Sequence, residues 1–94
     1  MIHLTDTIAI KADQNQYIIG KPITQSHDGE NTTKIASPRF YNSIGAALRA
    51  AVALSMRQDV AEDKITTLEQ FITQQRQLMD VFASRIEAAG LNLQ

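Results

Sequence analysis

The 94-residue sequence contains no cysteine and no tryptophan, only two prolines and four glycines, and no excess of either charge. Without cysteine the chain has no disulfide, no thiol nucleophile and no zinc–thiolate site. Nine lysines and arginines against ten aspartates and glutamates leave a formal net charge of −1. This balance argues against a strongly electrostatic nucleic-acid-binding protein, which usually has a clear basic excess.

A long apolar run is also lacking. The smoothest stretch, residues 44–56, carries Arg49 in its middle and is shorter than the roughly 20 apolar residues of a transmembrane helix. Residues 1–13 show no basic segment followed by an apolar core, so we expect no signal peptide. The default expectation is a cytoplasmic protein without membrane attachment, in a bacterial or phage-like context. Its length suits one domain, residues 1–94, with a single modest core.

The first third of the chain has the alternation of β-strands. Isoleucine and leucine occupy even positions between residues 2 and 10, with Asp6 interrupting the set. The polar cluster DQNQ at 13–16 separates this segment from YIIGKPI, which is rich in residues that favour strands. Residues 6–23 therefore predict a hairpin with a four-residue turn.

The segment after this hairpin is mostly polar. Residues 24–33 predict a loop, with a turn signal at Asp28-Gly29. KIAS at 34–37 predicts a short third strand, which would help because an isolated two-stranded hairpin is marginal in water.

The rest of the chain reads as two helices. The first is predicted from about residue 43 to 58, capped by Asn42 or Ser43. The second is predicted from about 67 to 89, where Thr66 and Glu69 fit a capping box and Gly90 fits the residue that ends the helix. The fold class predicted is α+β: an N-terminal antiparallel hairpin or three-stranded meander within about residues 2–36, then two antiparallel helices packed on one sheet face.

The second helix has the most regular apolar spacing in the chain. Its seam recurs every four and three residues and comprises Leu68, Ile72, Gln75, Met79, Phe82, Ile86 and Ala89. One interpretation is an amphipathic helix packed inside the chain. The other is a homodimeric coiled coil in which the polar Gln75 sets the register. For that second interpretation the predicted self-association residues are Ile72, Gln75, Met79, Phe82 and Ile86.

The first helix has a smooth second face made of alanines between two arginines. Small residues let another backbone approach closely, and arginine is enriched at protein interfaces. The alternative is that alanine, the best helix former, simply lies on the surface. The docking interpretation selects a set of partner-binding residues at the strand-to-helix corner and along this face: Arg39, Tyr41, Arg49, Ala53, Met56 and Arg57.

Chemistry beyond binding has little support. The two histidines, His3 and His27, lack the spacing of a helical metal site, and Ser43 has no adjacent base. We expect no enzymatic activity, no metal and no cofactor. Nucleic-acid binding is the alternative function, since Lys34 extends the arginines into a short basic row beside aromatic residues.

The order of ADQNQYIIGKPI, SPRFYNSIGAALRAAVALSMR and TTLEQFITQQRQLM along the chain resembles the small uncharacterised proteins of tailed phages and prophages, including P2-like ones. The resemblance runs from about residue 8 to about residue 82. The chain departs from that pattern at Gly45 and Ala46, where acidic or polar residues are common, and in its longer second helix. The resemblance implies no catalytic residue. It implies an accessory protein, made in an infected or lysogenic bacterium, of a kind that often binds host proteins.

The sequence therefore predicts a small non-enzymatic protein that has no membrane association, forms a homodimer and binds another host or phage protein. The resemblance implies inhibition of a host defence protein, such as a CRISPR effector, as a role of this kind.

Overall fold

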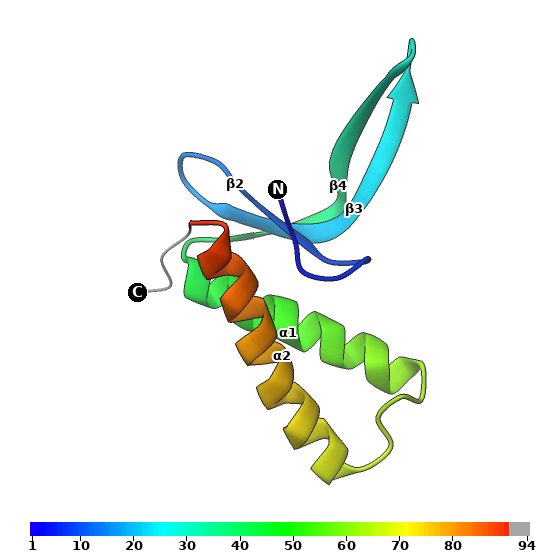
Figure 1. The fold of residues 1–94 in the computed structure, drawn as a ribbon, viewed down its shortest axis with the longest axis vertical. Coiled ribbons are helices and arrows are strands. Elements are labelled where there is room, and N and C mark those ends of the chain that lie inside the picture. Colours follow the sequence, from blue (N-terminus) through cyan, green and yellow to red (C-terminus); the bar gives the residue numbers. More distant parts are fainter. Residues whose placement is uncertain (91–94) are drawn as a thin grey trace.

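The structure is a computed structural model that describes residues 1–90, apart from the side chain of His27. A four-stranded antiparallel sheet in the order β1-β2-β3-β4 is followed by two helices (Figure 1). The elements are β1 Ile2–His3, β2 Ala9–Ala12, β3 Tyr17–His27, β4 Glu30–Tyr41, α1 Ile44–Ala61 and α2 Leu68–Ala88. This arrangement confirms the predicted α+β class, and it raises the number of strands from the expected two or three to four.

The N-terminal apolar segment is two short strands joined by a turn. The backbone N–H of Leu4 donates to the carbonyl oxygen of Ile8 at 2.9 Å, which reverses the chain between β1 and β2. The four-residue turn predicted at 13–16 is present, because Ala12 pairs with Tyr17. Asp13 holds this turn by accepting hydrogen bonds from the backbone N–H groups of Asn15 and Gln16, both at 2.9 Å.

The predicted polar loop at 24–33 is wrong: these residues form the far end of a long β3–β4 hairpin. Thr24 pairs with Thr33, and pairing continues to His27 and Glu30. Asp28 and Gly29 make a two-residue turn with φ of 51° and 82°, the positive values that a type I′ hairpin turn needs. The polar composition that indicated a loop belongs to a pair of strands whose residues 24–33 have no apolar face to bury.

A β-bulge divides the β3–β4 hairpin into two parts. The register steps from Ile19 opposite Arg39 to Lys21 opposite Ala36, so two residues of β4 face Gly20 alone. A Cβ on Gly20 would lie 2.6 Å from the Ala36 carbonyl oxygen, which explains glycine at this position. Beyond the bulge, residues 21–36 form a ribbon that turns away from the rest of the sheet (Figure 1). We call this segment the ribbon.

Both helices begin at a side-chain cap. Ser43 accepts from the backbone N–H of Ala46 at 3.1 Å, as one of the two predicted options requires. For α2 the predicted Thr66–Glu69 pair is shifted by one residue: Thr67 accepts from the N–H of Gln70, and the Gln70 side chain accepts from the N–H of Thr66. Thr66 with Glu69 and Thr67 with Gln70 have the same spacing, so the sequence alone does not show which pair caps the helix.

The core lies between the sheet and the helices, and α1 contacts both β3–β4 and α2. Its buried apolar residues come from the N-terminal strands, the start of β3, both helices and their connector: Leu4, Ile8, Ile10, Ile19, Ile44, Ala47, Leu48, Ala51, Val52, Met56, Ile65, Phe82 and Ile86. Two long-range hydrogen bonds fasten the β1–β2 turn to the helices. The Arg85 guanidinium donates to the Leu4 carbonyl oxygen, and the Thr7 hydroxyl donates to Gln58 Oε1 at 3.0 Å.

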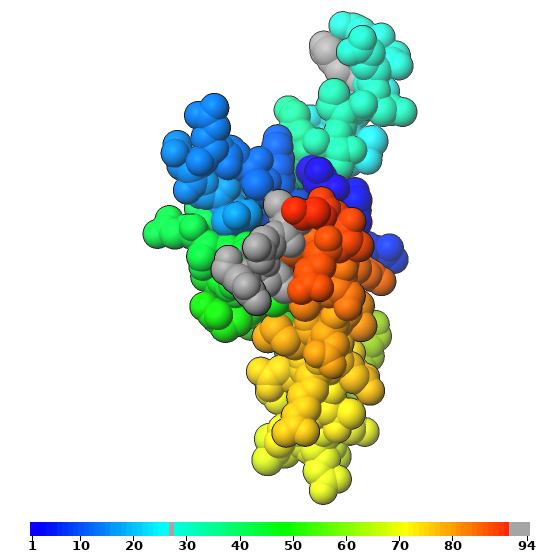
Figure 2. Space-filling view, turned by 60° about the vertical axis from the view of Figure 1, so that its left-hand side comes forward, coloured from blue at the N-terminus to red at the C-terminus, as the bar shows by residue number. Residues whose placement is uncertain are grey.

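The molecule is elongated, with principal extents of 48, 31 and 21 Å. The ribbon projects at one end of the long axis, and the first turns of α2 project at the other (Figures 1 and 2). The helices run in opposite directions and separate toward the connector at 62–67 (Figure 1). Among the described residues, neither helix has the length and apolar character that crossing a membrane requires.

Candidate functional site: a basic groove between β4 and α1

The outward face of α1 carries three residues at helical spacing, Arg49, Ala53 and Arg57, and all three are exposed. Residues four apart lie above one another on the same side of a helix. On the flank of this stripe, Ala50 and Leu54 turn toward the sheet and are half-buried. The end of β4 passes along this flank, so a hollow forms between strand and helix.

We call this hollow the arginine groove. It has a volume of about 150 Å³. Its lining comes from β3, β4 and α1, and consists of Ile19, Arg39, Tyr41, Ala50, Ala53, Leu54 and Arg57. Small-molecule sites usually measure roughly 300–1,000 Å³, so this space suits a single side chain better than a cofactor.

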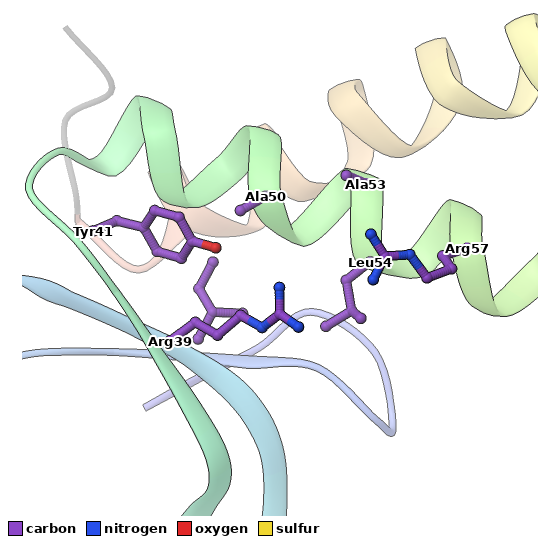
Figure 3. Close-up of a pocket in the computed structure, with 7 residues that line it drawn as sticks. Arg39, Tyr41, Ala50, Ala53, Leu54 and Arg57 are labelled. Carbon is purple, nitrogen blue, oxygen red and sulfur yellow. The ribbon is translucent and has the colours of Figure 1, made fainter.

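The polar groups of the groove come from two different elements. Arg39 extends from β4 and Arg57 from α1, and their guanidinium groups point toward one another across the opening (Figure 3). The hydroxyl of Tyr41 also points into the groove, with Ala50 nearby (Figure 3). The floor is apolar, because Ile19 is buried and Leu54 half-buried. The groove therefore has hydrogen-bond donors at its rim and an apolar floor.

The positive charge of the groove is not neutralised within the chain. In the described residues 1–90, neither Arg39 nor Arg57 forms an ion pair or a side-chain hydrogen bond. A neighbouring hollow shares Arg39 and Leu54 and includes Glu62, but this carboxylate pairs with Lys64 at 2.9 Å. Two guanidinium groups facing one space repel one another unless an anion lies between them.

Four of the six predicted partner-binding residues meet in this groove: Arg39, Tyr41, Ala53 and Arg57. Arg49 is exposed on the same stripe of α1 but does not line the groove. Met56 was placed on the outer face, and this was wrong, because it is only 2% exposed and lies in the core. Because α1 contacts both the sheet and α2, and Met56 belongs to the same buried cluster as Phe82 and Ile86, the buried face of α1 is wider than one amphipathic stripe.

Three groove residues escaped the sequence-based set: Ile19, Ala50 and Leu54. Ala50 and Leu54 are four residues apart, which marks a shared helix face, but the pattern alone does not say what that face meets. Ile19 could be found only through its pairing with Arg39 across β3 and β4, which needs the register of the hairpin.

The predicted self-association residues divide into two groups. Phe82 and Ile86 are buried in the core of the chain itself, so a second copy cannot reach them without opening that core. Met79 is half-buried, whereas Ile72 and Gln75 are exposed. The second-helix seam is therefore internal at its C-terminal end and uncovered at its N-terminal end.

Lys34, which the nucleic-acid alternative uses, lies elsewhere. It lines a separate hollow on the ribbon, together with Gln25, Ser26, Glu30 and Thr32. The arginine groove and Lys34 are thus distinct surfaces. In the part of the chain that the structure describes, no three histidine, aspartate or glutamate side chains gather as a metal site would require.

Comparison with protein-family models, with curated proteins and with solved structures finds no match for this chain.

Proposed function

We propose that this protein acts by binding another protein, without catalysing a reaction, and that the arginine groove receives an acidic side chain of the partner. The observation that carries this proposal is the convergence of Arg39 and Arg57 on one hollow with no carboxylate between them. A glutamate or aspartate entering the groove would relieve their repulsion. It would also accept charge-assisted hydrogen bonds, which are about twice as strong as neutral ones.

The surroundings of the two arginines support a protein partner. Tyrosine and arginine are the residue types that most often dominate the energy of protein interfaces. Tyr41 supplies a half-buried ring with its hydroxyl in the groove, and aromatic residues are enriched at protein interfaces. Arg49, further along the same stripe of α1, would lie at the rim of such an interface.

The resemblance to phage and prophage proteins suggests where to look for the partner. We propose that it is a bacterial or phage protein, and that inhibition of a host defence protein, such as a CRISPR effector, is a role worth testing first. The direct experiment is capture of partners from a bacterial lysate on the immobilised protein, with identification by mass spectrometry. The affinity of the captured protein is then measured with purified components.

The decisive variant is the double substitution Arg39→Glu and Arg57→Glu. We expect it to weaken binding by at least about 100-fold, since each removed arginine contact at a hot spot accounts for about tenfold or more. The matched control is Lys11→Glu with Lys34→Glu, two exposed lysines outside the groove that change the net charge equally. The control should bind within about threefold of the wild type, as rim charges contribute little.

Two results would contradict the proposal. If both double variants bind like the wild type, the groove is not the docking site. If both lose binding equally, and the loss follows salt concentration steeply, the interaction is a diffuse electrostatic one such as nucleic-acid binding.

A further inference from the structure

The N-terminal half of α2 exposes an apolar stripe that the chain does not cover. Leu68 is 74% exposed and Ile72 is 42% exposed. The exposed, polar Gln75 and the half-buried Met79, which packs partly against the core, continue the same stripe. The two helices separate toward this end (Figure 1). In the space-filling view the first turns of α2 form a free end of the molecule (Figure 2).

The stripe continues the seam that packs inside the chain further along α2. Its spacing of four and three residues is the heptad spacing of paired helices, and it runs unbroken into Phe82 and Ile86. Half of one continuous seam is therefore covered by the chain's own helix and strands, and half is left open. An apolar stripe on a helix is usually buried against another apolar surface.

The charges beside the stripe indicate what that helix is. Glu69 and Arg76 flank the stripe on its solvent side, one heptad apart, and both are exposed. They lie about 10 Å apart along the helix, too far to pair with each other. If a second α2 lies antiparallel, with the axis of symmetry between positions 73 and 74, each Glu69 comes beside Arg76 of the other copy. Two opposite-charge pairs then form.

The same arrangement matches the apolar residues. Leu68 comes opposite Met79 of the other copy, and Ile72 comes opposite Gln75, which remains at the edge where its amide can reach water. A parallel arrangement would instead place Arg76 near Phe71 of the second copy, without a carboxylate. The charge pattern thus favours the antiparallel pairing.

We propose that the protein forms a symmetric dimer in which the N-terminal halves of two α2 helices pack antiparallel through Leu68, Ile72, Gln75 and Met79. Two Glu69–Arg76 ion pairs flank this contact, and the α1 helices lie outside it. The proposal shares no residue with the arginine groove, so it stands or falls independently of the proposed function.

The apolar contact is tested by sedimentation velocity of two single variants. Ile72→Asp places a charge in the stripe, and Val81→Asp is its matched control, because Val81 is 43% exposed and lies on another face of α2. We expect the wild type and Val81→Asp to sediment as dimers, at twice the 10.4 kDa of one chain, and Ile72→Asp as a monomer. Circular dichroism of both variants should match that of the wild type.

Either of two outcomes would overturn the dimer: a wild type that is monomeric at its highest soluble concentration, or equal behaviour of the two aspartate variants. If Ile72→Asp loses helical signal, Leu68→Asp replaces it, since Leu68 has still less contact with the core.

The antiparallel register is tested by exchanging charges. Glu69→Arg or Arg76→Glu alone sets like charges against one another twice in each dimer, and we expect the dimer dissociation constant to rise about tenfold. The double variant Glu69→Arg with Arg76→Glu restores both pairs in reversed order. It should return to within about threefold of the wild type. Additive weakening in the double variant would overturn this register.

Discussion

The two projecting parts of the molecule, the ribbon and the N-terminal half of α2, differ in what they expose. The ribbon shows threonine, glutamine, asparagine and serine along its free length, and its end is closed by the Asp28-Gly29 turn. The helix end shows Leu68 and Ile72. Exposure of the polar ribbon to water has little free-energy cost. Exposure of an apolar helix stripe is unfavourable, and covering it with another surface would lower the free energy.

This difference separates two reasons for an element to extend beyond its core. Backbone pairing between β3 and β4 continues past the bulge because each added pair is local, and it needs no partner outside the hairpin. The first turns of α2 continue a seam that is already in use in the core. We therefore expect substitutions in the ribbon and substitutions in the N-terminal half of α2 to affect stability and association differently.

The largest expected effect contrasts the two halves of the seam. Phe82→Ala removes a fully buried ring and should lower the free energy of unfolding by about 3–5 kcal/mol. Ile72→Ala, in the open half, should change it by less than about 1 kcal/mol at a dilution where the chain is monomeric. Urea unfolding followed by circular dichroism measures both. Equal losses would mean that the open half is as well packed as the covered half.

An intermediate effect is expected at the boundary of the ribbon. Gly20→Ala drives a methyl group against the backbone of Ala36 and should cost about 1–3 kcal/mol, measured by thermal unfolding. Gly45→Ala in the first turn of α1 is the matched control. Its nearest neighbour would be Arg49 Nη1 at 3.5 Å, so we expect a gain of about 0.5 kcal/mol. An unchanged melting temperature of Gly20→Ala would show that the bulge does not require glycine at this position.

The smallest effect concerns the turn that begins β3. The hydrogen bond from the Asn15 backbone N–H, supported by Gln16, lowers the pKa of Asp13 below its ordinary value. A carboxyl group whose pKa is lower in the folded chain stabilises the fold above its unfolded pKa of about 3.9, and this contribution disappears as the pH falls through the folded pKa. The melting temperature of Asp13→Ala should therefore lie slightly below that of the wild type at neutral pH.

This difference should shrink as the solution is acidified below that range. A constant difference at all pH values would show that Asp13 acts through its shape and not through its charge.

Much of the architecture follows from local signals in the sequence. Ser43 caps the first helix, a threonine caps the second and Gly90 ends it with a positive φ of 88°. These residues satisfy backbone groups at helix ends, which is a local requirement, so their spacing reveals the helix bounds to within a few residues.

The ribbon could not be recognised from composition. A strand is usually recognised by alternating apolar and polar residues, which arise when one face of the strand is buried. Neither face of the ribbon is buried, so its sequence does not alternate in this way. The one local signal was the Asp-Gly pair, which is also common in loops. The pattern therefore identified the turn at residues 28–29 and the strand segments at 17–23 and 34–37, but not the strand pairing across residues 24–33.

The candidate site was predicted only in part for a related reason. Arg39, Tyr41 and Arg57 were found because arginine and tyrosine on a corner and an outer face indicate contact with a partner. Met56 was assigned to the wrong face because the position of α2 decides which side of α1 is covered. The apolar floor of the arginine groove includes Ile19, which lies there because it pairs with Arg39 beside the bulge. This pairing cannot be deduced from the sequence of either strand alone.

The hydrogen bond between Arg85 and Leu4 joins residues 81 positions apart in the chain. Contacts of such long sequence separation slow folding, because a large loop must close before they can form. The α1–α2 pair needs only its short connector to close, so we expect it to form early. The attachment of the β1–β2 turn to α2 would then form last. During synthesis β1, β2 and β3 can already pair with one another, but the carbonyl group of Leu4 has no contact with Arg85 until the last turns of α2 have been made.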